Sequence, residues 1–262
     1  MAVMPQRDIS VAMAARATAW ARRAFAVDLR SLAAFRMAIG GIVVADAVLR
    51  CRDVPLMFGP DGMFPLVPLR RYLGDPAAWS LAMLVDASWC GPALLALEGA
   101  AGLLLAFGCR TRWATIAAWI AVVSVLRRTA PATNAGDSWL ACLLFWGMFL
   151  PLGATWSWDR RRNGDRGSVR SAASVALVLQ IAVVYVAAGL SKCNATWLSG
   201  DAVRHALSVH DHGTPFGAWL VGSQWLSAPL SRAVVAGELL GPLLLVFAPS
   251  PTVRLALVAV FM

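Results

Sequence analysis

Residues 171–201 read SAASVALVLQIAVVYVAAGLSKCNATWLSGD, and this stretch decides the fold class. About twenty mostly apolar residues, enough for one bilayer crossing, run without a charge and end at Lys192. Among the 23 Lys and Arg residues of the chain, Lys192 is the only lysine. A lysine can lose its proton when it is desolvated, whereas an arginine stays charged. Lys192 is therefore interpreted either as an anchor that reaches from the helix end to the membrane surface or as a base.

The composition of the whole chain agrees with a membrane protein. Of the 262 residues, 59% are hydrophobic and 14% are charged, whereas soluble domains have about 25% charged residues. Twelve tryptophans suit the two membrane–water interfaces. The net charge of +9 comes from arginines between apolar runs, which favours membrane orientation and anionic lipid over nucleic acid. The alternating ten-residue pattern of an outer-membrane barrel is not found.

Apolar runs predict an all-α, polytopic membrane bundle of about seven spans with additional interfacial helices. Residues 1–27 are expected to be a basic amphipathic segment on the cytoplasmic surface, and residues 28–262 the transmembrane domain. The final run is too short for a crossing, so we expect the chain to be truncated at its C-terminus. Gly91-Pro92 is expected to break the apolar stretch 81–107, so that its span begins at residue 93. The runs are 31–49, 93–107, 113–126, 138–151, 171–190, 232–248 and 252–262.

The arginines also predict the orientation of the chain. With the N-terminus in the cytoplasm, the compact arginine-rich segments 1–30, 108–112 and 153–170 all lie inside, as the positive-inside rule requires. The GPDGMFP loop (59–65), the NAGD segment (134–137), Lys192 and the three histidines then lie on the other face. We therefore expect a functional site on the non-cytoplasmic face.

Isolated charges inside apolar runs are candidate functional residues because they are costly in a bilayer. Arg36 and Asp46 share the first span but lie ten positions apart, or about 15 Å along a helix. They cannot pair directly, so each needs another partner, either in a structural ion pair or in a site. We expect Glu98 or Glu238 to be the partner of Arg36, and the sequence does not say which of the two it is.

Cysteines and histidines give weaker signals. The five cysteines show no metal-binding spacing, and a disulfide among Cys51, Cys90 and Cys193 is one possibility. His210 and His212 could share one face of an extended segment and bind a metal, but an interfacial polar loop explains them as well. No metal site is predicted.

Five stretches occur in an order that resembles one family. The chain is similar to the HTTM proteins, which carry the horizontally transferred transmembrane domain and are related to the vitamin K-dependent gamma-carboxylase. The resemblance covers residues 28–262. The stretches are AFRMAIGGIVVADAVLR (34–50), GPDGMFP (59–65), GCRTRWATIAAWIAVVSVLRRTAPATNAGD (108–137), LLFWGMFLPLGATWSWD (143–159) and YVAAGLSKCNATWLSGDAV (185–203).

The resemblance implies a mechanism for Lys192. In the carboxylases, which are lyases, a lysine in a similar segment deprotonates a reduced quinone. Oxygen then generates a base strong enough to remove a proton from glutamate. Burial next to apolar helices favours the neutral amine that such a lysine needs. The resemblance thus implies a reduced quinone of the vitamin K or menaquinol type as cofactor.

Other residues receive supporting roles in this interpretation. Asp137 and Arg36 would position or stabilise charge, and Asn134 would line the quinone pocket. Tyr185 lies two turns before Lys192 on the same face and could line that pocket or only pack. Trp197 matches the family motif but would also serve as an interfacial anchor.

Two departures from the family weaken the transfer of its activity. Asp137 stands where animal carboxylases have a histidine, and a nearby aspartate would favour the charged lysine. The large C-terminal β domain is missing as well. The alternative is a non-catalytic factor for maturation of, or immunity to, an exported peptide. A transporter is less favoured because the halves show no inverted repeat. In either main interpretation we expect a bacterial cytoplasmic-membrane protein.

Overall fold

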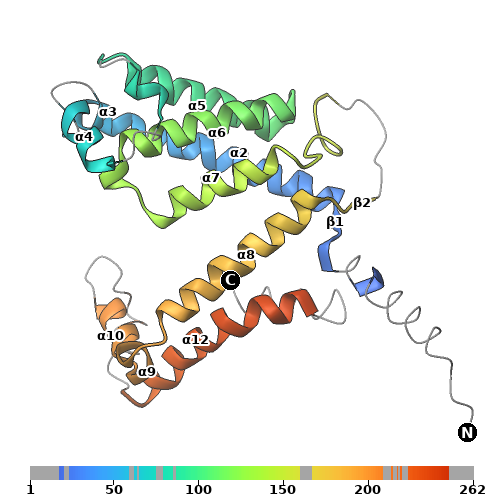
Figure 1. The fold of residues 1–262 in the computed structure, drawn as a ribbon, viewed down its shortest axis with the longest axis vertical. Coiled ribbons are helices and arrows are strands. Elements are labelled where there is room, and N and C mark those ends of the chain that lie inside the picture. The colour runs from blue at the N-terminus through green and yellow to red at the C-terminus, as the bar shows by residue number, and fades with distance from the viewer. Residues whose placement is uncertain are drawn as a thin grey trace, which may run out of the picture. The chain divides into compact units, whose positions relative to one another are not determined.

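The structure is a computed structural model. It describes residues 18–20, 24–58, 62–63, 65–74, 79–84, 87–159, 167–208, 214, 217, 219 and 224–247. The chain splits into two compact units, one formed by Ala26–Val175 and the other by Met1–Phe25 with Ala176–Met262. The longer helices are α2 (Leu29–Arg50), α5 (Cys90–Phe107), α6 (Thr111–Arg128), α7 (Ala135–Gly147), α8 (Ala172–Ser191) and α12 (Gln224–Phe247) (Figure 1).

Short elements connect the long helices. The short helices are α3 (Val54–Met57), α4 (Leu66–Leu73), α9 (Ala195–Ser199) and α10 (Asp201–Ser208), and the 3₁₀ turns are Cys51–Asp53, Leu81–Met83 and Ala130–Ala132. Two-residue strands β1 (Val27–Asp28) and β2 (Ser168–Val169) pair antiparallel.

The Ala26–Val175 unit is a bundle in which α5 packs against α2 and α6, and α7 packs against α6. Local chemistry sets the helix ends. The Asp28 side chain caps α2 by accepting the backbone N–H of Arg30 at 2.7 Å, which lowers the pKa of the Asp28 carboxyl. At the start of α7, Asn134 and Asp137 form a reciprocal capping box. Their side chains accept hydrogen bonds from two backbone N–H groups that have no carbonyl partner within the helix.

Glycines bring α2 and α5 into backbone contact. A Cβ on Gly40 would lie 2.7 Å from the Ala106 backbone nitrogen, and a Cβ on Gly102 would lie 2.9 Å from Val43. Gly99 lies opposite Ala47, with 3.7 Å between their Cβ positions. Low residue numbers on α2 thus face high numbers on α5, so the helices are antiparallel. Small residues are the usual means of close helix packing in membranes.

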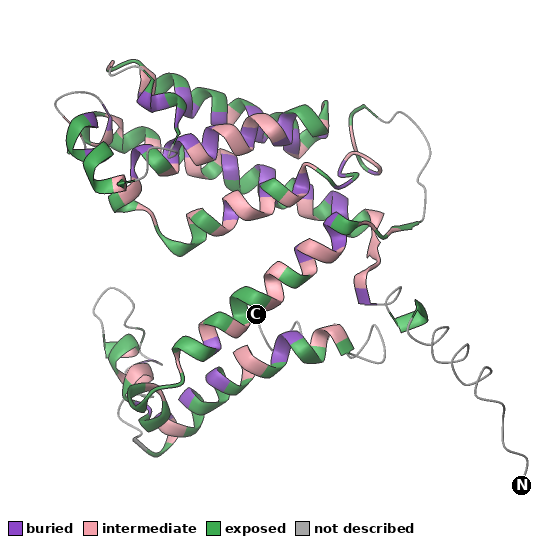
Figure 2. Cartoon of the chain, in the orientation of Figure 1, coloured by how far each residue is buried: buried purple, intermediate pink, exposed green. Residues whose placement is uncertain are grey.

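Burial follows one face of each helix in this bundle (Figure 2). The buried side chains of α6 are mostly small, with Ala114, Ala118 and Ala121 at most 3% exposed. Many large apolar side chains face outward instead, such as Val48, Phe107 and Trp113. Outward apolar surface of this kind is what a surrounding lipid phase would cover.

The other unit is built from α8, α9, α10 and α12. Helices α9 and α10 pack against each other and against α12. Helix α8 approaches α12 near the C-terminal end of α8, where a Cβ on Gly189 would lie 2.8 Å from Leu239. Most apolar residues of α8 and α12 are exposed or half-buried (Figure 2).

The all-α membrane architecture is confirmed, whereas the expected number of about seven spans is not. Four helices among the described residues are long and apolar enough to cross a membrane: Leu29–Met57, Cys90–Phe107, Ala172–Ser191 and Trp225–Phe247. Helices α6 and α7 do not meet that description, although the sequence predicted spans there. Most of the predicted N-terminal segment 1–27 and the whole final run 252–262 lie outside the described residues.

Two predicted helix boundaries were wrong. Helix α5 begins at Cys90 and includes Gly91 and Pro92 in its first turn. Backbone N–H groups of a first turn have no partner within the helix, so a proline there costs no helical hydrogen bond. The sequence predicted a break there. Helix α12 begins at Gln224, eight positions before the predicted start, and contains Pro229 and Pro242.

Replacing Gly40 by alanine is expected to weaken the α2–α5 contact. The new methyl group would meet the backbone of α5, which cannot move aside as a side chain can, and overpacking of this kind costs about 1–3 kcal/mol. Gly41→Ala is the matched control, because a Cβ there meets nothing within 4 Å and alanine favours helix by about 1 kcal/mol. Thermal unfolding of both variants in detergent measures the difference. Equal melting temperatures would contradict the close contact.

Candidate functional site

Lys192 forms a two-point ion pair with Glu238. Its Nζ atom lies 2.5 Å from Oε1 and 2.6 Å from Oε2 of that carboxylate. Lys192 directly follows α8, and Glu238 lies within α12. The two side chains are 21% and 18% exposed. An ammonium group in this setting is shielded from water and holds both carboxylate oxygens.

An aromatic ring completes the surroundings of the Lys192 ammonium. Nζ lies 5.2 Å from the centroid of the Trp197 ring, within the range of a cation–π interaction. Asn194 caps α9 by accepting the Trp197 backbone N–H at 3.2 Å, which fixes the start of the helix that carries the ring. We call Lys192, Glu238 and Trp197 the lysine site.

Helix α9 is fastened to α12 by side chains of α12. The Ser231 hydroxyl donates to the Trp197 carbonyl, and Arg232 Nε donates to the Leu198 carbonyl at 2.9 Å. Gly200 ends α9 in the left-handed conformation (φ 94°), and a Cβ there would lie 2.6 Å from the Ala228 nitrogen. These contacts hold α9, which carries Trp197, against α12, which carries Glu238.

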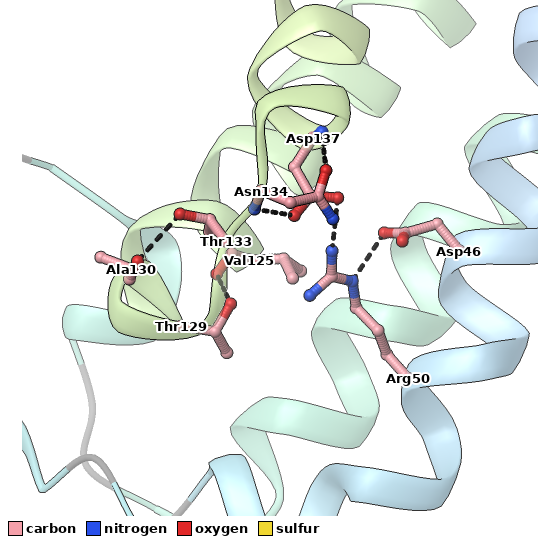
Figure 3. Close-up of polar contacts among 8 residues, drawn as sticks. All are labelled: Asp46, Arg50, Val125, Thr129, Ala130, Thr133, Asn134 and Asp137. Carbon is pink, nitrogen blue, oxygen red and sulfur yellow. Dashed lines mark hydrogen bonds and ion pairs between the residues drawn. The ribbon is translucent and has the colours of Figure 1, made fainter. Parts of the chain in front are cut away.

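A second charged cluster lies in the Ala26–Val175 unit. Arg50 donates to Asp46 at 2.8 Å and to Asp137 at 2.9 Å, so one guanidinium joins α2 to the start of α7 (Figure 3). The three side chains are between 11% and 21% exposed. The spacing of four between Asp46 and Arg50 is a helix-pair signal that the sequence reading missed.

Glu98 adds a third carboxyl to this cluster. It is 0% exposed, and neither of its carboxyl oxygens has a hydrogen-bond donor among the described residues. Asp46, Arg50 and Asp137 all act electrostatically on Glu98, and Asp46 acts on it most strongly. We call Asp46, Arg50, Glu98 and Asp137 the carboxyl cluster.

The partners predicted for Arg36 were wrong. Arg36 is fully buried and donates to the backbone carbonyls of Leu152, Thr155 and Trp156 at 3.1, 3.3 and 2.6 Å. Backbone carbonyl oxygens thus bind the two terminal nitrogens of the guanidinium in place of a carboxylate, whereas its Nε has no partner among the described residues. Glu98 lies in the carboxyl cluster, and Glu238 binds Lys192. Arg36 thus fastens residues 152–156 to α2.

The predicted site residues fall into the two units. Lys192 and Trp197 come together in the lysine site, and Tyr185 lies two turns earlier on α8 with 39% of its surface exposed. Asn134 and Asp137 come together at the start of α7, where they bond to each other and Asp137 also binds Arg50. Lys192 has Glu238 of its own unit as its acidic partner, and the expected proximity of Asp137 to Lys192 stays a prediction.

Some predictions concern residues that the structure describes only in part or not at all. His210 and His212 lie outside the described residues, as does most of the GPDGMFP loop. The five cysteines are free, so the possible disulfide among Cys51, Cys90 and Cys193 is not formed. A signal for Glu238 existed in the sequence, since an acid in an apolar helix requires a basic partner.

Apolar helices that carry isolated, paired charges define an integral membrane protein of the helical-bundle class. The HTTM domain family matches residues 25–262, and the chain belongs to this family. Comparisons with curated proteins and with solved structures gave no match.

Reversing the Lys192–Glu238 pair is expected to test its contribution to stability. Lys192→Glu or Glu238→Lys alone places like charges together in a shielded position, and each should lower stability by on the order of 2 kcal/mol. The double variant restores opposite charges and should recover most of the loss. Melting temperatures in detergent provide the measurement.

The exposed Asp201–Arg204 pair serves as the control for this experiment. Reversing it should change stability by less than about 1 kcal/mol, because water screens surface ion pairs. If the Lys192–Glu238 double variant were no more stable than the single variants, the two charges would not be paired in the folded protein.

Proposed function

We propose that this HTTM protein is a membrane enzyme in which Lys192 and Glu238 remove a proton from a lipid-soluble reduced quinone. The observation that carries the proposal is the lysine site itself. The only lysine of the chain stands at the end of an apolar helix, held by one carboxylate and facing one tryptophan ring. Purely structural ion pairs in this protein are made by arginine, as in the Arg50–Asp46 pair.

The paired lysine can act as a base because its proton has a place to go. Transfer of one proton from the Lys192 ammonium to the Glu238 carboxylate gives a neutral amine and a neutral carboxylic acid. The amine then accepts a proton from the substrate hydroxyl and becomes an ammonium again. In total the pair takes up one proton, and it returns that proton when the product leaves. The direct contact of Nζ with both carboxylate oxygens supports such a transfer.

The surroundings of Lys192 fit a planar, lipid-soluble molecule. Trp197 offers an aromatic face next to the amine, and Tyr185 lies about 10 Å away along α8, at seven residues of helix rise. The exposed apolar side chains of α8 and α12, such as Val183 and Leu243, suit a hydrocarbon tail. When bound, the reduced quinone would supply the electrons for reaction with oxygen, as the resemblance to the carboxylase implies.

The supporting roles differ from those first expected. Both terminal nitrogens of Arg36 donate to backbone carbonyls, so we assign Arg36 to holding residues 152–156. Asn134 caps α7, and Asp137 positions Arg50. Glu238 becomes the acidic partner of the base, and Trp197 its aromatic contact.

A second function has one observation in its favour. The two-point ion pair fully occupies the Glu238 carboxylate, as expected of a clasp that joins α8 to α12. In that case the protein would be a non-catalytic membrane factor that matures, or gives immunity to, an exported peptide. Arginine would then replace Lys192 without harm, because it preserves the charge and can bond both oxygens.

The substitution Lys192→Arg is expected to separate the two functions. An arginine keeps the ion pair but does not release its proton, so the variant should fold and lose at least 100-fold in turnover of a reduced menaquinone under oxygen. Lys192→Ala should be equally inactive. Purified wild-type protein in lipid nanodiscs, assayed for quinol consumption and for epoxide by mass spectrometry, provides the measurement.

The control is Arg204→Gln, an exposed change on α10 that should leave turnover intact. Wild-type turnover in the Lys192→Arg variant would refute the role of Lys192 as a base. The second function would be established instead if the wild-type protein were inactive and co-purified with a peptide. The Lys192→Arg variant should then bind that peptide equally well.

A further inference from the structure

The fully buried Glu98 is unusual because its oxygens meet no donor among the described residues. The charged group that acts on it most strongly is another carboxyl, that of Asp46. Both groups are hydrogen-bond acceptors when ionised. Two ionised carboxylates close to each other repel, whereas a single proton shared between them forms a bond.

The α2–α5 contact fixes this meeting independently of any charge. Gly99 lies opposite Ala47, and Gly102 lies next to Val43. Asp46 and Glu98 are the chain neighbours of Ala47 and Gly99, so the two acids share one level of the antiparallel pair. Separating the helices to relieve the repulsion would lose the close backbone packing at Gly40 and Gly102.

The charge balance of the carboxyl cluster also requires a proton. Three carboxyls surround one guanidinium, and Arg50 already donates to Asp46 and Asp137. With all three ionised, the cluster would have an excess of negative charge in a bundle interior. A buried carboxylate without a donor is strongly unfavourable, and such a group takes up a proton instead.

Among the described residues, the charged groups known to act on Glu98 come from two helices. They are Asp46 and Arg50 on α2 and Asp137 at the start of α7. Helix α6 also packs on α5, and there Ala121 and Val125 share a buried apolar cluster with Leu94 and Leu95. The charged residues of α6 stand in its first and last turns, at Arg112, Arg127 and Arg128.

We propose that Asp46 and Glu98 form a proton-binding site within the bundle, in which the two carboxyls share one proton. The proton belongs to the pair rather than to either residue. Its loss would add one negative charge next to Arg50, which links α2 to α7. The pair can therefore accept or deliver a proton inside the membrane, and the proposal is independent of the chemistry assigned to Lys192.

Infrared spectroscopy of the full-length protein in lipid nanodiscs tests this site. The wild type at neutral pH should show a protonated carboxylic acid band that shifts in D₂O and disappears at strongly alkaline pH. Glu98→Gln should remove that band, and Glu238→Gln, which changes an acid in the other unit, should keep it. Asp46→Asn should shift the band, because the proton loses its carboxylate partner. A band that is absent, or unchanged in Glu98→Gln, would overturn the proposal.

Stability gives a second readout. Glutamine resembles a protonated glutamate in shape and in hydrogen bonding, so Glu98→Gln should melt within a few degrees of the wild type. It should also lose the alkaline fall in melting temperature that the wild type shows as the shared proton leaves. A Glu98→Gln protein that fails to fold would refute the proposal. Such a result would mean that the site does not accept a neutral side chain of this shape.

Discussion

The cost of placing charge among apolar helices governs this structure. A charged group in a bilayer needs a partner within the protein, and three of the described charges in or next to the long helices meet this need in different ways. Arg36 binds backbone carbonyls, Arg50 binds two carboxylates, and Lys192 binds one carboxylate and faces a ring. These solutions determine which helix faces pack together and where polar chemistry can occur.

The two charged sites differ in what they can do. In the lysine site an amine meets a carboxylate, and in the function that we propose a proton passes between them. In the carboxyl cluster the permanent cation is an arginine, which keeps its proton. There the proposed mobile proton belongs to the two acids. Trp197 adds an aromatic surface to the lysine site, which suits the substrate that we propose for it.

Much of the architecture follows from the apolar pattern of the chain. The pattern identified α2, α8 and the main part of α5, because long charge-free runs have few alternatives to a membrane helix. It was less reliable where prolines occur. Pro92 was read as a helix breaker but stands in a first turn, and Pro229 lies inside α12. Proline position relative to a helix end depends on neighbouring contacts that no local pattern records.

The sequence by itself determined that the protein is a helical membrane protein of the HTTM type and that its only lysine stands at the end of an apolar helix. Only the tertiary structure decided the partners. Glu238 lies 46 positions after Lys192, and Asp137 lies 87 positions after Arg50. Separations of this size are closed by helix packing, such as the glycine contact between α2 and α5. Charge pairing across helices therefore depends on the folded geometry, whereas the cost of leaving those charges unpaired can already be read in the sequence.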